Sequence, residues 1–270
     1  MARPACFHLM NALPDVARWR LLRTPAADGA TNMAIDHSLL RFAAASGEAI
    51  VRVYAWAPAT VSFGRNQRAV GAYDADRLAA DGLGVVRRPT GGRSILHDRE
   101  LTYSVSLPST GPARARGAYE AVTTMLLAAL RHLGVEAVRA APAARSRPPG
   151  PAPCFAEPAA GEVGWHGRKL AGSAQWAEGA ALLQHGSVLV DDDQRRLATL
   201  TDLAEVPTPA TLRAAIGRAP TLDEFADAWR AAVGTATGVD PVPLESDAPE
   251  AQPLPPLLRL YHDDAWTWRR

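Results

Sequence analysis

Lys169 is the only lysine in this chain, although 29 side chains are lysine or arginine. The other 28 (29 minus 1) are arginine, so a position that needed only a surface charge would be expected to hold arginine as well. Lysine differs from arginine because it is a compact point charge whose pKa shifts readily with its surroundings. We therefore predict that Lys169 belongs to a functional site.

Cys154 lies fifteen positions before Lys169 and is the second candidate. The only other cysteine is Cys6, so the spacing predicts neither a zinc site nor a disulfide framework. A free cysteine is often simply buried, but residues 142–153 contain five prolines and no periodic pattern, which predicts a loop. A loop cysteine near an ammonium is favoured as the nucleophilic thiolate. We predict that Cys154 is a nucleophile and that Lys169 lowers its pKa.

A dense polar motif occupies residues 87–98, with the sequence Arg-Arg-Pro-Thr-Gly-Gly-Arg-Ser-Ile-Leu-His-Asp. Gly91 and Gly92 allow positive φ angles and a close approach of the backbone to a ligand. Paired glycines are also common in ordinary hairpin turns. The polar side chains beside them, including Arg88, Thr90 and His97, favour the wall of a binding site instead.

The elements that must position these residues follow from periodicity. Helical spacing predicts helices at residues 32–45, with Thr31 as the cap, at 73–80, at 119–133, and at 225–233 after a capping box at 221–224. Alternating or apolar runs predict strands at residues 50–56, 60–63, 85–88, 101–107, 162–165, 169–176 and 180–190. We expect the strands at 85–88 and 101–107 to flank a glycine turn, and the last three to be successive antiparallel strands with turns at Gly167 and Gly179. This order indicates an α+β fold with mixed, mainly antiparallel sheets and packed helices.

Composition excludes several classes of protein. With 270 residues and 47% hydrophobic residues, the chain can bury a substantial core. Its formal net charge of +1 is not that of a nucleic-acid-binding protein. No run approaches the roughly 20 apolar residues that span a bilayer, and the N-terminus has no apolar run of signal length. We expect a cytoplasmic protein with no membrane or nucleic-acid partner.

Three motifs together resemble the catalytic domain of the biotin/lipoate protein ligase and octanoyltransferase superfamily. They are the motif at 87–98, Gly-Arg-Lys-Leu-Ala-Gly-Ser-Ala-Gln at 167–175, and Gln-His-Gly-Ser-Val-Leu at 184–189. The resemblance extends to residues 32–36, to 52–64 and to the tail at 261–270. It implies the fold of that domain with a short C-terminal helical extension. We expect no metal site. The resemblance also implies substrate contacts from Arg88, Thr90, Gly91, Gly92, His97, Gly172, Ser173, Ala174, His185 and Gly186.

The resemblance also implies a division of the chain and shows three departures from the family pattern. We expect an N-terminal fringe at 1–18, the catalytic domain at 19–239, and a linker and C-terminal tail at 240–270. Arg93 replaces the usual third glycine, residues 64–67 resemble the ligase version of that turn, and residues 158–161 lack the usual Ser-x-Tyr.

The sequence Cys-Phe-Ala-Glu-Pro at 154–158, followed by Lys169, resembles the cysteine-dependent branch of the superfamily. This implies an octanoyltransferase without a cofactor. It would move octanoate from octanoyl-acyl carrier protein, through a thioester on Cys154, to a lysine of a lipoyl-domain protein such as the glycine cleavage H protein. Backbone N–H groups near Gly172 or Ser173 are expected to stabilise the oxyanion. His185 is expected to position groups rather than to act as a general base.

Three other functions fit parts of the pattern. An ATP-dependent lipoate–protein ligase would use Lys169 to contact an acyl-adenylate and would not need Cys154. An amidotransferase would use the same Cys154 and Lys169 to move octanoate between two lipoyl-domain proteins. A non-catalytic protein that binds lipoyl domains or acyl chains would need neither residue.

Overall fold

The structure is a computed structural model and describes residues 13–109, 112–140, 162–200 and 207–269. Its elements are β1 (Trp19–Arg23), α2 (Gly29–Ser46), β2 (Ala49–Tyr54), β3 (Thr60–Phe63), α3 (Ala75–Ala80), β4 (Gly84–Arg87), β5 (Ile95–His97), β6 (Glu100–Pro108), α4 (Pro112–His132), β7 (Val138–Arg139), β8 (Val163–Trp165), β9 (Arg168–Glu178), β10 (Ala181–Leu189), α5 (Gln194–Thr199), α6 (Leu212–Ile216), α7 (Leu222–Thr237), β11 (Val242–Leu244), the 3-10 helix η2 (Pro249–Ala251), α8 (Pro255–His262) and α9 (Asp264–Thr267). None of the helices within the described ranges is long and apolar enough to cross a membrane.

Two sheets form the framework. The large sheet has the strand order β11-β1-β2-β6-β10-β9-β8-β7, and the small sheet has the order β4-β3-β5. In the large sheet, β1 is parallel to both β11 and β2, whereas every neighbouring pair from β2 to β7 is antiparallel. In the small sheet, β3 is parallel to β4 and antiparallel to β5. The expected α+β fold with mixed, mainly antiparallel sheets is therefore confirmed.

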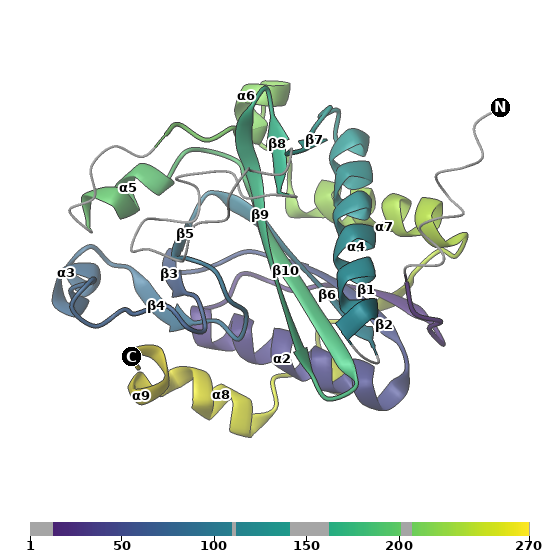
Figure 1. Ribbon diagram of the computed structural model, residues 1–270, viewed down its shortest axis with the longest axis horizontal. Helices are drawn as coiled ribbons and strands as arrows, with labels where there is room; N and C mark the ends of the chain where they lie inside the picture. The colour runs from purple at the N-terminus through teal and green to yellow at the C-terminus, as the bar shows by residue number, and fades with distance from the viewer. Residues whose placement is uncertain (1–12, 110–111, 141–161, 201–206, 270) are drawn as a thin grey trace.

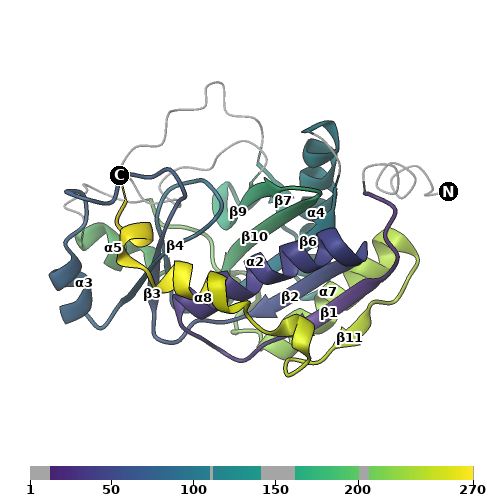
Figure 2. The ribbon, with the colours of Figure 1, turned by 90° about the horizontal axis from the view of Figure 1, so that it is seen from below.

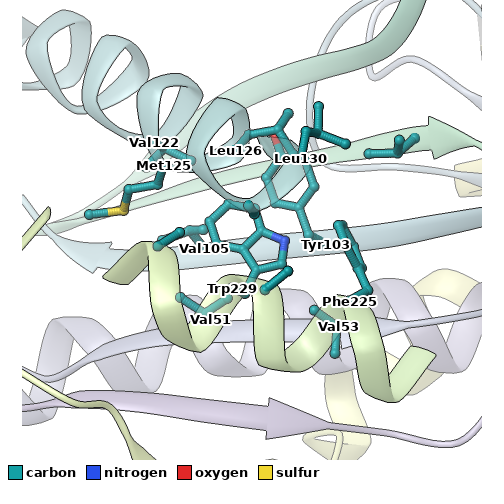
Figure 3. Packing of buried hydrophobic residues seen from close by; sticks show 14 of the residues in the cluster. Val51, Val53, Tyr103, Val105, Val122, Met125, Leu126, Leu130, Phe225 and Trp229 are labelled. Carbon is teal, nitrogen blue, oxygen red and sulfur yellow. The ribbon is translucent and has the colours of Figure 1, made fainter. Parts of the chain in front are cut away.

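Helices cover both faces of the large sheet. Figures 1 and 2 show α4 and α7 on one face, and α2 with α8 on the other. Alternation along β2 explains the two layers, because successive side chains of a strand point to opposite faces. Val51 and Val53 join the core under α4 and α7, where Trp229 packs against Tyr103 (Figure 3). Ile50, the residue before Val51, points to the other face and packs with α2.

The helix α2 begins earlier than its sequence pattern predicts. We expected residues 32–45 with Thr31 as the cap, but α2 spans Gly29–Ser46 and its cap is Asp28. The Asp28 side chain accepts hydrogen bonds from the backbone N–H and the hydroxyl of Thr31. Carboxylates are strong N-caps, and the glycine that follows is required because a Cβ at Gly29 would lie 2.9 Å from side-chain atoms of β3 and β4.

The strands at 162–165, 169–176 and 180–190 are confirmed as the successive antiparallel strands β8, β9 and β10. Gly167 and Gly179 lie in their turns with positive φ angles of 74° and 58°. The capping box is confirmed as well. Thr221 accepts a hydrogen bond from the backbone of Glu224, and the Glu224 side chain accepts one from the backbone of Thr221 at the start of α7.

The glycine turn is not a link between strands 85–88 and 101–107. A third strand, β5, lies between them, and β4 and β5 pair on opposite edges of β3 rather than with each other. The chain therefore crosses the end of β3 between Arg87 and Ile95. Three residues are too few for a strand of this kind to show a clear alternation.

Residues 240–256 are more than the linker that we expected. They contain β11, which pairs with β1 at the edge of the large sheet, and the short helix η2. The strand β1 was also missed by periodicity. The tail then forms α8 and α9, as the expected helical extension, and α8 packs along α2 (Figure 2).

Candidate active site

A cavity of about 370 Å³ lies between the small sheet and the centre of the large sheet. Its walls come from strands of both sheets, from the connection between β4 and β5, and from single residues of α2 and α4. Nine of the ten residues predicted to contact substrate line it: Arg88, Gly91, Gly92, His97, Gly172, Ser173, Ala174, His185 and Gly186. The tenth, Thr90, is fully buried and contacts His185.

The Gly91–Gly92 segment is braced from two sides. Gly92 has a φ angle of 98°, and a Cβ at Gly64 would lie only 1.9 Å from the Gly92 carbonyl oxygen. The guanidinium of Arg88 donates hydrogen bonds to the carbonyl oxygens of Gly91, at 2.8 Å, and Arg93, at 2.7 Å. Arg88 therefore shapes this wall as well as lining the pocket.

Glycine also matters where β9 and β10 meet at the pocket. A Cβ at Gly186 would lie 2.6 Å from the Gly172 carbonyl oxygen and 2.8 Å from the Ser173 hydroxyl. Gly186 is opposite Ser173 in the register of the two strands. A larger residue at 186 would push the strands apart, which is a steric reason for a glycine at this position of the pocket wall.

His185 lies in a buried chain of hydrogen bonds. Its Nδ1 is 3.1 Å from a carboxylate oxygen of Asp36, and its Nε2 is 2.7 Å from the Thr90 hydroxyl. Burial opposes ionisation of Asp36, but Arg52, 2.8 Å away, and His185 outweigh it and hold the pKa of Asp36 below its ordinary value. Burial lowers the pKa of His185 despite Asp36. His185 is therefore a neutral imidazole that donates to Asp36 and accepts from Thr90.

A second chain of the same kind is built around His97. Its Nδ1 is 2.6 Å from Glu100 and its Nε2 is 2.8 Å from the Ser62 hydroxyl. The ring stacks on Trp56, with centroids 3.9 Å apart and planes 13° from parallel. The indole of Trp56 donates to Thr102, which in turn donates to Glu100. Each chain of hydrogen bonds fixes one imidazole in one orientation. A histidine held in this way can bind a ligand or transfer a proton through a defined ring nitrogen.

Lys169 does not itself line the pocket. Its side chain is buried in β9, and its ammonium lies 2.6 Å from a carboxylate oxygen of Glu162, which does line the pocket. A buried ammonium requires such a counter-ion. Cys154 lies outside the described residues, so its predicted proximity to Lys169 remains a prediction.

The sequence interpretation assigned no role to Glu162, Asp36 or Arg52. A signal for Arg52 was present, because an arginine within the apolar run at residues 49–54 implies a buried, paired charge. Glu162 carried no comparable signal, since it precedes a short strand as many solvent-exposed carboxylates do. The oxyanion role predicted for the backbone near Gly172 and Ser173 remains a prediction. Both residues line the pocket.

Comparison with known proteins places this geometry in a family. Residues 28–234 match the model of the lipoyl protein ligase A/B catalytic domain. The chain is 32% identical to the octanoyltransferase LipM of Staphylococcus epidermidis, over 93% of this chain and 99% of that protein. It is 35% identical to the LipM of Kyrpidia tusciae over the same shares, and 32% identical to that of Bacillus subtilis over 93% and 98%.

Solved structures show the same fold. A putative lipoate protein ligase from T. acidophilum superposes with a TM-score of 0.73 and 21% identity, covering 94% of this chain and 99% of that one. A lipoate-protein ligase A bound with ATP gives a TM-score of 0.73 and 22% identity over the same shares. The match of residues 28–234, together with relatives above 30% identity along nearly the whole chain, establishes that this protein belongs to the lipoyl protein ligase A/B catalytic domain family.

Proposed function

We propose that this protein moves octanoate from octanoyl-acyl carrier protein, through a thioester on Cys154, to a lysine of a lipoyl-domain protein such as the glycine cleavage H protein. Octanoyltransferase activity in lipoate biosynthesis rests on the LipM relatives, which match along 93% of the chain. The structural observation that supports it is a cavity that is lined by nine of the ten expected substrate residues. We place the protein in the cytoplasm, where a catalytic thiol stays reduced.

The pocket suits a medium-length acyl chain. Its volume of about 370 Å³ is within the range of small-ligand sites. Met33, Tyr54, Trp56 and Ile95 contribute apolar surface to the walls. Burying an eight-carbon chain there contributes on the order of 5 kcal/mol, at about 0.8 kcal/mol per CH₂ group. The polar chains around His97 and His185 would then lie at the walls, where they hold the shape of the pocket.

Two acyl transfers make up the reaction. The Cys154 thiolate forms a bond to the octanoyl carbonyl carbon, and the carbon–sulfur bond to the carrier breaks, so that the carrier leaves as a thiolate and takes up a proton. One thioester replaces another, and no nucleotide is consumed. The neutral amine of the acceptor lysine then forms the amide bond, the Cys154 sulfur leaves, and the amine loses a proton. We assign Lys169 to stabilising the thiolate, with Glu162 as the counter-ion that holds its ammonium in place.

The direct test is the intact mass of the protein after incubation with octanoyl-acyl carrier protein and no nucleotide. We expect the addition of one octanoyl group that hydroxylamine removes. Cys154→Ser should abolish the addition, whereas the matched control Cys6→Ser should retain it. Modification of the acceptor by lipoate and ATP, with octanoyl-acyl carrier protein ignored, would instead establish a ligase. Octanoylation of Cys154 only by an octanoylated lipoyl-domain protein would establish an amidotransferase.

A further inference from the structure

Arginine and tryptophan side chains gather beside the pocket, where the C-terminal helix meets the segment after β3. We call Arg65, Arg269, Trp176 and Trp266, together with the buried Arg87, the arginine–tryptophan cluster. The guanidinium carbon of Arg65 lies 4.9 Å from the ring centroid of Trp176 and 5.7 Å from that of Trp266. That of Arg269 lies 3.8 Å from Trp266. Figure 2 shows α9, which carries Trp266, beside β4.

The cluster borders the pocket. The backbone N–H of Arg65 donates to the Thr90 carbonyl oxygen at 2.7 Å, and the next two residues, Gly91 and Gly92, line the cavity. On the other side, Trp176 follows the lining residue Gln175 in β9. A ligand held by Arg65 would therefore lie at the edge of the cavity and not at a remote surface.

The positive charge of the cluster is not balanced. In the described ranges of the chain, no carboxylate lies within 4.0 Å of the guanidinium groups of Arg65, Arg87 or Arg269. Burial, with the like charges of Arg269 and Arg88, lowers the pKa of Arg87 to about 10. Burial and Arg65 lower the pKa of Arg269. Cations that repel one another attract an anion, because its binding relieves the repulsion.

Arg65 and Arg269 also have hydrogen-bond donors to offer. The Arg65 guanidinium makes one long contact of 3.5 Å, to the Pro89 carbonyl oxygen, and Arg269 makes one of 2.7 Å, to the Arg65 carbonyl oxygen. A guanidinium has five N–H donors, so most of them face no acceptor among the described residues. Their planar fork matches the oxygens of a phosphate group. Arg87 differs, because its donors are used on backbone carbonyls.

We infer that the arginine–tryptophan cluster binds the phosphodiester of the donor's phosphopantetheine arm while the octanoyl group occupies the cavity. This inference rests on the proposed function, because the carrier protein presents its thioester on an arm that also bears a phosphate. The acyl chain and the phosphate are then held at two ends of one site. Binding the phosphate would favour the loaded carrier over thioesters that lack it.

The test measures binding without turnover. In a Cys154→Ser background, which cannot be acylated, octanoyl-phosphopantetheine and octanoyl-pantetheine are titrated by calorimetry. We expect the phosphorylated thioester to bind about tenfold or more tightly, as one strong charge-assisted hydrogen bond allows. Arg65→Gln or Arg269→Gln should reduce this ratio to about threefold or less. The control Arg131→Gln removes a charge from the exposed surface of α4 and should leave the ratio unchanged.

Several outcomes would overturn the inference. Equal affinities for the two thioesters in the Cys154→Ser protein would show that no phosphate is recognised. Loss of carrier-protein affinity in Arg65→Gln, with the small-molecule ratio intact, would assign the cluster to acidic side chains of the carrier. Tighter binding of ATP than of octanoyl-phosphopantetheine, lost in Arg65→Gln, would assign the phosphate to a nucleotide. Because no acyl transfer is measured, each result stands apart from the mass test of the proposed function.

Discussion

The buried carboxylate of Asp36 is paired on both of its oxygens. Asp36 accepts hydrogen bonds from Arg52, Tyr54, Ser104 and His185, and all five side chains are buried. A fully satisfied buried charge specifies one arrangement, because any displacement leaves a charged group without its partner. These hydrogen bonds therefore hold His185, which lines the pocket, in one orientation.

Buried histidines should make stability depend on pH. Burial lowers the pKa values of His185 and His37, so below about pH 6.5 the unfolded chain binds protons that the folded chain does not. The free energy of unfolding should consequently fall as the pH decreases from 7.5 to 5.5, by up to about 1.4 kcal/mol per histidine per pH unit below 6.5. Urea denaturation at the two pH values measures this.

The same experiment on two variants identifies the residue. His185→Asn should show a smaller difference between the two pH values, because one of the two histidines with a lowered pKa is gone. His132→Asn, at an exposed position of α4, serves as the control and should behave like the wild type. An unchanged pH dependence in His185→Asn would contradict the assignment of His185 as a buried neutral imidazole.

The second prediction concerns the effect of Lys169 on the pKa of the Cys154 thiol. If Lys169 favours the Cys154 thiolate, Lys169→Ala should move the pH dependence of Cys154 alkylation by iodoacetamide to higher pH. Lys169→Arg should restore the midpoint only in part, because its charge is spread over a longer planar head. All variants carry Cys6→Ser, and Arg168→Ala, the exposed neighbour, is the control. Identical midpoints in wild type and Lys169→Ala would remove Lys169 from this role.

At the scale of elements, the pocket depends on how the β4–β5 connection crosses the end of β3. The crossing is possible because Gly64 has no side chain, so the Gly92 carbonyl can approach the backbone there. Arg88 then holds the connection through the carbonyl oxygens of Gly91 and Arg93. The close approach of Gly64 and Gly92, together with Arg88, therefore holds the β4–β5 connection in place as a wall of the pocket.

Gly64→Ala should be strongly destabilising. Its Cβ would lie 1.9 Å from the Gly92 carbonyl oxygen, which is backbone and cannot rotate away. We expect a loss of more than about 2 kcal/mol in the free energy of unfolding, at the upper part of the range for overpacking. Gly234→Ala in α7 is the matched control, because nothing lies within 4 Å of its Cβ. It should stabilise the protein by about 0.5–1 kcal/mol, and chemical denaturation measures both. A neutral Gly64→Ala would show that the crossing is looser than described.

At the scale of the whole molecule, hydrogen bonds fasten the C-terminal tail to the end of β4 in the small sheet. Arg87, at the end of β4, donates hydrogen bonds to the carbonyl oxygens of Trp266, Thr267 and Arg269, and the indole of Trp266 donates back to the Arg87 carbonyl oxygen. Figure 1 shows the tail running along α2 to reach this point. Segments nearly 180 residues apart are thereby joined by one guanidinium.

Removing residues 264–270 should destabilise the protein by about 2 kcal/mol or more, because several donors of the buried Arg87 lose their acceptors. Arg87→Met in the full chain should also be costly, since it leaves the same carbonyl oxygens unpaired. The two changes combined should cost clearly less than the sum of their separate effects, which a double-mutant cycle by chemical denaturation measures. Additive effects would mean that Arg87 and the tail act independently.

The sequence alone determined those structural features that depend on residues close together in the chain. Periodicity predicted the helix at 225–233 with its capping box and the three successive strands of residues 162–190, because these features repeat within one element. Long, ordered motifs predicted the set of residues that meets at the pocket. Periodicity did not predict β11 or β5, because three residues do not establish a period.

Only the tertiary structure decided which distant side chains become partners. In the large sheet β2, β6 and β10 are consecutive neighbours, and α2 packs across all three. This packing brings together Asp36 of α2, Arg52 of β2 and His185 of β10. Glu162 meets Lys169 because β8 and β9 form an antiparallel pair. Such contacts follow from strand order and helix packing, which are set by the burial of the whole apolar surface, and no local pattern encodes them.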